Sequence, residues 1–302
     1  MWRDELISLF LNKKIKFYQF ADFSEITSMK LGGKMSLLVE PEDIDRMIFA
    51  FCSARKFGVP VSIVGGMTNT LPPDGIFDGV VIRTARIGTF EYTENNGVRA
   101  DCGASIGAIS RGMSERGIGG FAELAGIPGT IGGALYGNAG AYGVSISDRV
   151  IEVDVYDLAR DSKRVLSPDD IGYGYRDSLF KREDRYLILS AKLQGYAAEC
   201  DHLKEKIAEY ARIRRKKQPL SMPSLGSVFK HPSGDFAPRL IESLGLKGFR
   251  IGGAEVSTAH AGFIVNRGAA TSRDVKDVIA TIKKRVYDAY GIELEEEINY
   301  LM

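Results

Sequence analysis

The stretch AGIPGTIGGALYGNAGAYG, residues 125–143, is the most glycine-rich part of the chain. Successive glycines permit left-handed turns and expose backbone N–H groups in concave arrays, which bind phosphate oxygens without a formal positive charge. A second glycine loop, VGGMTN at residues 64–69, directly follows a β-rich run. A tight turn explains one such loop, whereas two favour a cofactor that contains a pyrophosphate group. Neither loop has the lysine of a Walker sequence.

The composition around these loops is that of an ordinary globular protein of about two domains. Hydrophobic residues make up 44% of the 302 positions and charged residues 26%, which excludes collagen-like, disordered and coiled-coil classes. Lysine and arginine number 40 against 39 acidic residues, for a net charge of +1. No global field therefore attracts nucleic acid or an anionic membrane. The basic run at 212–217 is interpreted as a solvated helix face.

Cysteine, histidine and the N-terminal sequence carry further expectations. The three cysteines have wide spacing and form no CxxC pair, which argues against a disulfide framework or a thiolate metal site. None of the three histidines has metal-ligand spacing to another, so no metal is expected. The N-terminal MWRDELISLF contains acids and lacks a cleavage site, and no run of about 18 apolar residues occurs. We expect a cytoplasmic protein without a membrane span.

Periodicity and glycine punctuation predict a sheet-rich first part and a smaller mixed second part. The first part runs to about residue 195, and the charged helix that Pro219 ends separates it from the second. In the first part we expect helices at 41–58 and 104–117, a strand leading into the loop at 64–69, an antiparallel series over 79–102, a hairpin at 150–167 and a strand at 185–196. In the second part we expect helices at 201–219, 236–245 and 271–291, with strands at 252–257 and 261–266.

Two other glycine patterns suggest different chemistry. Gly117–Ala122 matches GxGxxG/A by letter, but a helix precedes it where a dinucleotide fingerprint needs a strand. Gly103–Gly107 matches GxSxG, lies between an expected strand and helix, and has all three histidines downstream. A serine hydrolase that uses Ser105 is therefore an alternative. The structural interpretation, with Ser105 as a helix N-cap, is favoured because serine is a preferred cap.

Motifs along nearly the whole chain, in the same order, resemble the UDP-N-acetylenolpyruvoylglucosamine reductase (MurB) family. These are flavoenzymes of peptidoglycan synthesis in the vanillyl-alcohol-oxidase/PCMH flavin-binding superfamily. The resemblance covers about residues 27 to 298. The motifs are TSMKLGG at 27–33, VGGMTNTLPPDGIFDGVVI at 64–82, the stretch at 125–143, YRDS at 175–178, QPLSMPSLGSVFKHP at 218–232, IGGAEVSTAHAGFIVN at 251–266 and GIELEEEI at 291–298. The chain lacks the inserted tyrosine-bearing lid and so resembles the short, lidless branch.

The resemblance implies an α+β fold, with a PCMH-type FAD-binding domain of two α/β subdomains and a smaller α+β substrate-binding domain. We expect an N-terminal helical segment at 1–26, the FAD-binding domain at 27–195 and the substrate-binding domain at 196–302. The family's enzymes hold FAD non-covalently and use NADPH to reduce it. Hydride then passes to C3 of the enolpyruvyl group of a UDP-sugar, and C2 is protonated. The expected partners are these small molecules, and the expected state is a monomer or weak homodimer.

Three residues match the family's catalytic positions. Arg176, in YRDS, matches the active-site arginine, and a planar guanidinium can hold a carboxylate through two parallel hydrogen bonds. Ser227, in GSVFK, matches the serine that protonates C2. Glu297 matches the terminal acid that helps to stabilise the enol-like intermediate. The neighbouring Glu295 and Glu296 are interpreted as solvated.

The same resemblance implies two larger sets of binding residues. The cofactor set is Val64, Gly65, Gly66, Met67, Thr68, Asn69, Thr70, Ala125, Gly126, Pro128, Gly129, Gly132, Gly133, Ala134, Asn138 and Gly140. The substrate set is Tyr142, Tyr175, Lys217, His231, His260 and Asn266. Met67 stands where the family usually has a small residue, so its bulk is expected to alter the flavin loop. This departure leaves a non-catalytic flavin- or nucleotide-sugar-binding protein as a second alternative.

Overall fold

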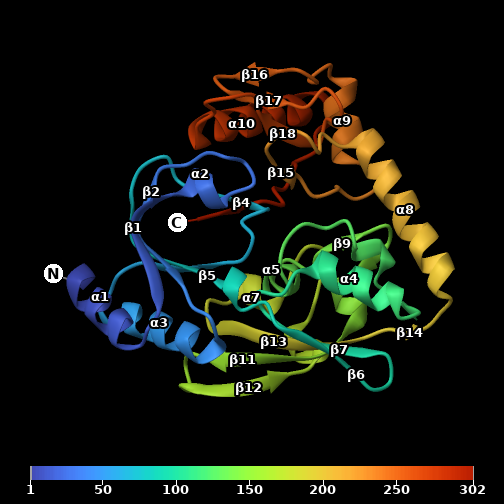
Figure 1. Ribbon diagram of the computed structural model, residues 1–302. Helices are drawn as coiled ribbons and strands as arrows, with labels where there is room; N and C mark the ends of the chain where they lie inside the picture. The colour runs from blue at the N-terminus through green and yellow to red at the C-terminus, as the bar shows by residue number, and fades with distance from the viewer. Residues whose placement is uncertain (1, 302) are drawn as a thin grey trace. The chain divides into compact units, whose positions relative to one another are not determined.

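The computed structural model describes residues 2–301 and divides the chain between two units. Unit 1 comprises Met1–Phe17, Val39–Gly66 and Val81–Arg212. Unit 2 comprises Tyr18–Leu38, Met67–Val80 and Ile213–Met302. Figure 1 follows the chain by colour, and the long helix α8 (Cys200–Lys217) carries it from unit 1 into unit 2 for the last time.

A four-stranded sheet contains the segments at which the chain changes units. Its order is β1 (Lys16–Asp22), β2 (Lys34–Glu40), β5 (Phe77–Arg83) and β3 (Val61–Val64), and the unit limits fall within β1, β2 and β5. Sequence periodicity predicted β3 and β5 but neither β1 nor β2. Six of the seven residues of β2 are buried, so it lacks the polar alternation that marks a half-exposed strand.

Unit 1 is built on a five-stranded antiparallel sheet. Its order is β12 (Ser162–Leu166), β11 (Val150–Asp157), β13 (Tyr186–Gln194), β7 (Gly97–Asp101) and β6 (Phe90–Thr93). The predicted hairpin at 150–167 is therefore confirmed. The antiparallel series predicted over 79–102 is only partly confirmed, because β6 and β7 pair with each other whereas its first strand is β5 of the four-stranded sheet. Apolar side chains of this sheet pack with α4 (Ile106–Glu115) and α5 (Ile131–Tyr136) into one core, in which Ile109, Leu135 and Val153 are fully buried.

The remaining elements of unit 1 are short, apart from two helices near its N-terminus. α3 (Ile44–Lys56) begins after Asp43, whose carboxylate accepts the N–H of Arg46 at 2.7 Å as an N-cap, and it ends before Gly58. The predicted helix at 41–58 is thus confirmed, with a start three residues later. The others are α1 (Trp2–Asn12), η1 (Thr84–Arg86), β8 (Ile118–Gly119), η2 (Ala122–Leu124), β9 (Gly140–Ala141), β10 (Val144–Ser145), η3 (Ile146–Arg149), α6 (Pro168–Ile171), α7 (Leu179–Arg182) and β14 (Tyr196–Ala197).

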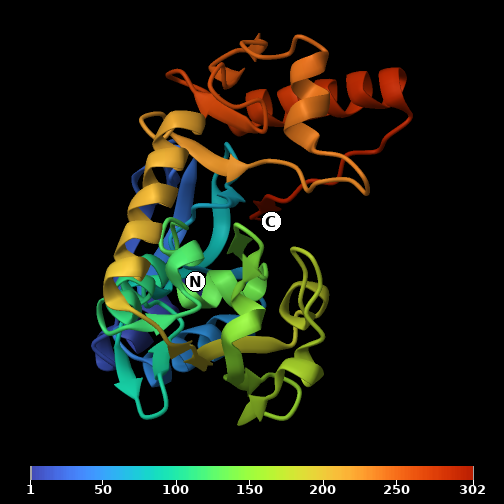
Figure 2. The same cartoon turned by 90° about the vertical axis from the view of Figure 1, so that its right-hand side faces the viewer.

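Unit 2 is a four-stranded antiparallel sheet packed on a long helix. The sheet order is β15 (Ser224–Ser227), β18 (Phe263–Asn266), β17 (Ala254–Val256) and β16 (Arg250–Ile251). α10 (Ser272–Tyr290) lies along this sheet, as Figure 2 shows. The unit also contains α2 (Phe23–Ile26), α9 (Ala237–Ser243) and a parallel pair formed by β4 (Thr70–Leu71) and β19 (Asn299–Tyr300).

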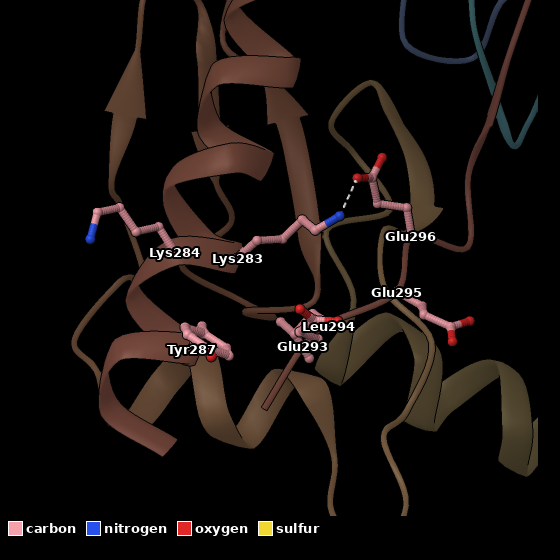
Figure 3. A pocket seen from close by; sticks show the side chains of 7 residues that line it. All are labelled: Lys283, Lys284, Tyr287, Glu293, Leu294, Glu295 and Glu296. Carbon is pink, nitrogen blue, oxygen red and sulfur yellow. Dashed lines mark hydrogen bonds and ion pairs between the residues drawn. The ribbon is translucent and has the colours of Figure 1, made fainter. Parts of the chain in front are cut away.

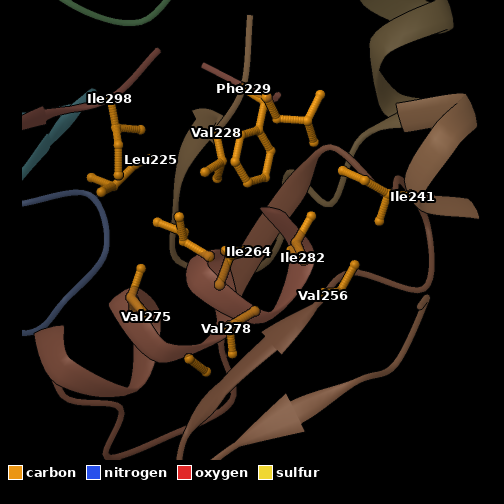
Figure 4. Close-up of a cluster of buried hydrophobic side chains, with 14 of the residues drawn as sticks. Leu225, Val228, Phe229, Ile241, Val256, Ile264, Val275, Val278, Ile282 and Ile298 are labelled. Atoms are coloured by element: carbon orange, nitrogen blue, oxygen red, sulfur yellow. The ribbon is translucent and has the colours of Figure 1, made fainter. Parts of the chain in front are cut away.

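The predicted ends of α10 are confirmed and have clear physical causes. The Thr271 hydroxyl accepts the N–H of Asp274 at 3.0 Å, and the Asp274 carboxylate accepts the N–H of Thr271 at 2.9 Å, which is a capping box. Gly291 ends the helix in the left-handed conformation. Figure 4 shows Val275, Val278 and Ile282 of this helix in the core of unit 2. Full burial of one such side chain contributes about 1.5–3 kcal/mol.

The two units divide the chain differently from the domains predicted at 1–26, 27–195 and 196–302. The segment expected to be helical also contains β1, because KFYQFAD is rich in β-forming aromatics. Unit 2 takes residues 18–38 and 67–80 from the first part of the chain, since Met29, Leu31 and Leu71 pack into its core. Periodicity within single segments does not reveal such long-range packing.

The membrane and cysteine expectations can also be compared with the structure. No helix within residues 2–301 has the length and apolar composition needed to cross a bilayer. Cys52, Cys102 and Cys200 are all free thiols. Burial raises the pKa of Cys102 to about 12, so this thiol stays protonated and packs as a small apolar side chain.

Candidate functional site

The two glycine loops identified from the sequence meet within unit 1. Gly65 directly follows β3, and a Cβ atom added to it would lie 2.2 Å from the Thr130 hydroxyl oxygen. Any side chain at position 65 would therefore displace the Thr130 side chain. The Thr130 hydroxyl also caps α5, where it accepts the N–H of Gly133 at 3.4 Å. Thr130 was not among the predicted site residues, although a hydroxyl residue directly before a helix is a usable cap signal.

The second loop is pressed onto the end of β7. Gly132 donates its N–H to the Cys102 carbonyl at 2.7 Å, and Ile131 donates to the Ala104 carbonyl at 2.9 Å. A Cβ atom on Gly132 would lie 3.0 Å from the same Cys102 oxygen. These amides therefore stabilise the loop itself and are not donors to an anion. Glycine at position 132 provides close backbone approach, which a cofactor-binding loop also needs.

The FAD group implied by the glycine loops can be tested against this geometry. A cofactor-binding loop needs close backbone packing, and Gly65 and Gly132 provide it where a Cβ atom would meet the Thr130 hydroxyl and the Cys102 carbonyl. Gly129 adopts φ +130°, a conformation that L side chains rarely adopt. The glycine loops of unit 1 are therefore closely packed on each other and on the end of β7, and this tight backbone packing fits an FAD-binding loop pair.

The GxSxG and GxGxxG patterns have structural roles. The Ser105 hydroxyl accepts the N–H of Ala108 at 3.3 Å as the N-cap of α4. A Cβ atom on Gly103 would lie 1.9 Å from the Thr84 carbonyl oxygen, so glycine is required there for packing. The GxGxxG match leads through the two-residue strand β8 into the short helix η2, which is not the strand–loop–helix order of a dinucleotide fingerprint.

Arg176 is held by the loop that follows α5. Its guanidinium donates to the Asn138 carbonyl at 3.2 Å and to the Gly140 carbonyl at 2.7 Å. The Asn138 side chain in turn donates to the Gly174 carbonyl at 2.8 Å. The guanidinium also lies 5.3 Å from the ring of Tyr175, within range of a cation–π interaction. The structure therefore brings together four predicted site residues, and it assigns Asn138 and Gly140 a contact with the arginine.

Tyr142 follows in the same loop and stacks on α8. Its ring is 3.9 Å from that of Tyr210 with 13° between the planes, and its hydroxyl donates to the Tyr210 carbonyl at 3.4 Å. Tyr142 remains 40% exposed and has φ +52°. This exposed aromatic surface suits contact with a planar ligand.

Met67 is the first residue of the 64–69 loop that belongs to unit 2. Its carbonyl accepts the N–H of Ser28 at 3.2 Å and the hydroxyls of Thr27 and Ser28 at 3.4 and 3.3 Å. The residue has φ +46°, and its side chain is only 3% exposed. The Met67 side chain is thus buried in the protein interior, where its bulk is accommodated. Thr27 and Ser28 of the TSMKLGG motif hold the loop backbone through the Met67 carbonyl.

Ser227 and Glu297 belong to adjacent backbone segments of unit 2. Glu297 donates its N–H to the Val228 carbonyl at 2.7 Å, next to Ser227 at the end of β15. The Asn69 side-chain amide donates to the Glu297 carbonyl at 3.1 Å. Thr70 pairs with Asn299 in the β4–β19 ladder. Two predicted catalytic residues and the end of the 64–69 glycine loop therefore meet in this unit.

The three successive glutamates differ in their surroundings. Glu295 is 73% exposed at its side chain and accepts Lys230 Nζ at 2.8 Å. Glu296 is only 21% exposed and accepts Lys283 Nζ at 2.9 Å and the Tyr300 hydroxyl. The interpretation of Glu296 as solvated was wrong, because its carboxylate is bound by Lys283 of α10 and by Tyr300. Figure 3 shows this pair at the hollow lined by Lys283, Lys284, Tyr287, Glu293, Leu294, Glu295 and Glu296.

The remaining predicted substrate residues lie in unit 2 in different settings. His260 Nδ1 accepts the N–H of Gly262 at 3.1 Å. Burial, reinforced by the nearby Lys247, lowers the pKa of His260, so its imidazole is neutral at pH 7. His231 is exposed and meets the ring of Phe236 edge-on at 5.3 Å, and Lys217 is exposed at the end of α8.

Asn266 is buried and its amide is fully used within unit 2. Its nitrogen donates to the Met29 and Lys30 carbonyls at 3.0 and 3.2 Å. Its oxygen accepts the N–H groups of Gly268 and Ala270 at 2.8 and 3.1 Å. The two bonds to Met29 and Lys30 tie the TSMKLGG motif to the sheet, and the other two order the loop after β18, so the structure supports a positioning role. Its predicted contact with substrate stays a prediction.

Comparisons with known proteins agree with this geometry. A family model for the C-terminal domain of UDP-N-acetylenolpyruvoylglucosamine reductase matches residues 218–301, and an FAD binding domain model matches residues 35–162. A UDP-N-acetylenolpyruvoylglucosamine reductase of Caldicellulosiruptor saccharolyticus is 41% identical over 288 residues, which cover 95% of this chain and 92% of that protein. One from Thermotoga maritima is 42% identical over 281 residues, which cover 92% and 96%.

A solved structure extends the similarity to the fold. The crystal structure of UDP-N-acetylenolpyruvylglucosamine reductase (MurB) from Thermus caldophilus matches with a TM-score of 0.78 and 26% identity, and the match covers 95% of this chain and 99% of that one. Neither the serine hydrolase nor the non-catalytic alternative is favoured by these matches. The chain belongs to the UDP-N-acetylenolpyruvoylglucosamine reductase family and is an FAD-dependent oxidoreductase.

Proposed function

We propose that this chain reduces the enolpyruvyl group of UDP-N-acetylglucosamine enolpyruvate to give UDP-N-acetylmuramate, with NADPH as electron donor, in peptidoglycan precursor synthesis. The observation that carries this proposal is the meeting of Ser227, Glu297 and Asn69 in a chain about 40% identical to reductases of that name. FAD held by the glycine loops would supply the hydride, with NADPH as the source of its electrons. The residues of the chain bind the substrate, balance its charge and deliver a proton.

The proposed cofactor residues are those of the two glycine loops. The close approach of Gly65 to the Thr130 side chain supports this assignment, because it brings the two loops together at one place. Thr130 joins the predicted set by the same argument. Gly132 and Gly133 contribute close packing, since their N–H groups already bind protein atoms.

Arg176 is the proposed partner of the substrate carboxylate. Negative charge grows on this carboxylate and on C2 as hydride reaches C3, so a fixed cation lowers the barrier. The carbonyls of Asn138 and Gly140 hold the guanidinium before substrate arrives. Such preorganisation avoids reorientation during the reaction.

Ser227 is the proposed proton donor to C2, and Glu297 is proposed to stabilise the enol-like state. A neutral serine hydroxyl donates one proton and accepts hydrogen bonds, which suits transfer to a developing carbanion. The backbone bond from Glu297 to Val228 supports concerted placement of the two residues. We do not propose Glu296 for this role, because Lys283 and Tyr300 already bind its two carboxylate oxygens.

Substrate contacts are proposed for the remaining polar and aromatic residues. The exposed rings of Tyr142 and Tyr175 offer surfaces for a planar base, and Lys217 offers a charge for the diphosphate. The neutral imidazole of His260 offers its second ring nitrogen as a hydrogen-bond donor. His231 and Asn266 complete the proposed set.

The proposal also includes the setting in which the enzyme works. We infer a cytoplasmic enzyme, monomeric or weakly dimeric, that binds neither nucleic acid nor membrane, because the net charge of +1 provides no strong field for either. FAD binding is assigned to residues 27–195 and substrate binding to residues 196–302. Limited proteolysis and sedimentation measurements with and without ligands test these points.

Visible absorption spectra test the reaction. A flavin band that NADPH bleaches under anaerobic conditions, and that the UDP-enolpyruvyl sugar restores, establishes both half-reactions. Bleaching without restoration would contradict the assigned substrate. Absence of a flavin band in folded protein after incubation with FAD would contradict the cofactor.

The variant Ser227→Ala tests the proton donor. We expect flavin reduction by NADPH to remain normal, while reoxidation by substrate slows about 10²- to 10⁴-fold, the scale for a positioned general acid. Stopped-flow absorbance separates the two rates. Ser233→Ala, on an exposed loop of the same unit, is the matched control. An equal loss in both half-reactions would rule out the role of Ser227.

A further inference from the structure

The C-terminal segment places polar and apolar side chains on alternate sides. Leu294 and Ile298 are buried in the core of unit 2, at 2% and 4% exposure. In an extended chain every second side chain points to the same side, so Glu296 points to the side of Leu294 and Ile298. Glu295 and Glu297 then point to the other side. The residue that precedes the proposed catalytic acid is thus a carboxylate in a position where the pattern expects an apolar side chain.

Two residues compensate for this inward carboxylate. Lys283, on α10, donates to Glu296 Oε1 at 2.9 Å, and the Tyr300 hydroxyl donates to Glu296 Oε2. Burial and the bond to Glu296 raise the pKa of Tyr300, so its hydroxyl remains a donor across the physiological range. Figure 3 shows the Lys283 side chain extended from the helix toward Glu296.

The same short segment is bonded on its other side to the strand that carries Ser227. Phe229 and Glu296 form a β-bridge, Lys230 donates its N–H to the Glu295 carbonyl at 2.9 Å, and Glu297 donates to Val228. Any movement of Glu296 toward water would draw Glu297 with it, because adjacent residues share a peptide plane. An uncompensated, half-buried carboxylate has a strong tendency to make that movement.

We propose that Lys283 and Tyr300 are positioning residues for the reduction. They bind the inward-facing Glu296 carboxylate and thereby fix the position of the adjacent Glu297 carboxylate. This inference rests on the proposed role of Glu297. The two residues do not touch the reacting atoms. Their effect passes through Glu296 and the peptide bond that joins it to Glu297.

The variants Lys283→Met and Tyr300→Phe test the inference. In each we expect the limiting rate of flavin reoxidation by substrate to fall about 10- to 100-fold, the scale on which ångström-sized misplacement acts. Flavin reduction by NADPH and the KM for substrate should change little. Amide hydrogen exchange at Glu297 should accelerate, which reports the loosened segment without reference to activity. Lys283→Arg, which keeps the charge, should stay close to the parent in both readouts.

A double variant separates positioning from general loss of stability. Lys283→Met combined with Glu296→Met removes the stranded carboxylate together with its partner, and well-packed apolar replacements of buried ion pairs are often tolerated. We therefore expect the double variant to recover most of the reoxidation rate that Lys283→Met loses. Lys284→Met, which removes a charge paired with Asp288 on the exposed face of the same helix, is the matched control and should resemble the parent.

Three outcomes decide the matter. Normal reoxidation and normal Glu297 exchange in Lys283→Met and Tyr300→Phe would overturn the inference. A double variant as slow as Lys283→Met would also overturn it, since the stranded carboxylate would not be the cause. Glu297→Gln, measured in parallel, tests the underlying proposal: if reoxidation stays normal there, the role of Glu297 fails, independently of whether the network holds the segment.

Discussion

At the scale of single residues, Met67 shows how burial outweighs backbone strain. Its left-handed φ of +46° costs about 1–2 kcal/mol for a residue with a side chain, which Met67→Gly would relieve. The same substitution removes a side chain that is 3% exposed, and truncation of a buried methionine costs about 2–5 kcal/mol. We therefore expect Met67→Gly to be less stable than the parent by urea unfolding. Asn95→Gly, at an exposed left-handed position, should be nearly neutral, and a stabilised Met67→Gly would show that strain outweighs burial.

The residues of the candidate site differ in how far the sequence could identify them. Arg176, Ser227 and Glu297 lie in recognisable motifs, and the structure brings Ser227 and Glu297 onto adjoining segments. The exact function of Asn138 could not be predicted, because its carbonyl, which any residue has, binds Arg176. Lys283 and Tyr300 escaped notice because their importance depends on Glu296 facing inward.

At the scale of elements, Asp157 joins the ends of three strands. It ends β11, lies next to β13 and β12, and accepts both Arg185, at 2.9 and 2.8 Å, and Arg164, at 3.3 Å. Its side chain has no exposed surface, and the Arg185 bonds hold the pKa of its carboxyl well below the usual value of 3.8. The charged form is thus favoured in the folded state, so Asp157 stabilises the fold above pH 3.8 and progressively less as the pH falls further.

Asp157→Asn tests this junction. We expect a lower unfolding temperature at pH 7, because Arg160, Arg164 and Arg185 lose their common carboxylate. We also expect the variant to lose less stability than the parent on acidification, because the titrating carboxylate is gone. Thermal unfolding monitored by circular dichroism from pH 3 to pH 7 measures both effects. Asp201→Asn, at a side chain that is 92% exposed, should leave the profile unchanged. Parallel pH profiles for Asp157→Asn and the parent would contradict the assignment.

Element prediction succeeded where local chemistry decides and failed where packing decides. The caps of α3 and α10 and the hairpin of β11 and β12 follow from nearby residues. β2 was not predicted, because nearly all of its residues are buried and its sequence therefore does not alternate between polar and apolar residues. The parallel β4–β19 pair joins residues more than 200 positions apart, and no local signal marks it.

At the scale of the whole molecule, FAD binding should couple to stability. A ligand that binds only the folded chain stabilises it by about 2.7 kcal/mol at 100 times its Kd. Gly65→Ala should reduce this FAD-dependent gain, because the new Cβ would lie 2.2 Å from the Thr130 hydroxyl and displace the Thr130 side chain. Thermal unfolding of the FAD-free protein at increasing FAD concentrations measures the gain separately from any intrinsic loss. Gly75→Ala, whose Cβ would meet nothing within 4 Å, is the control. An equal FAD-dependent gain in Gly65→Ala and the parent would show that the contact between the loops is not part of the cofactor site.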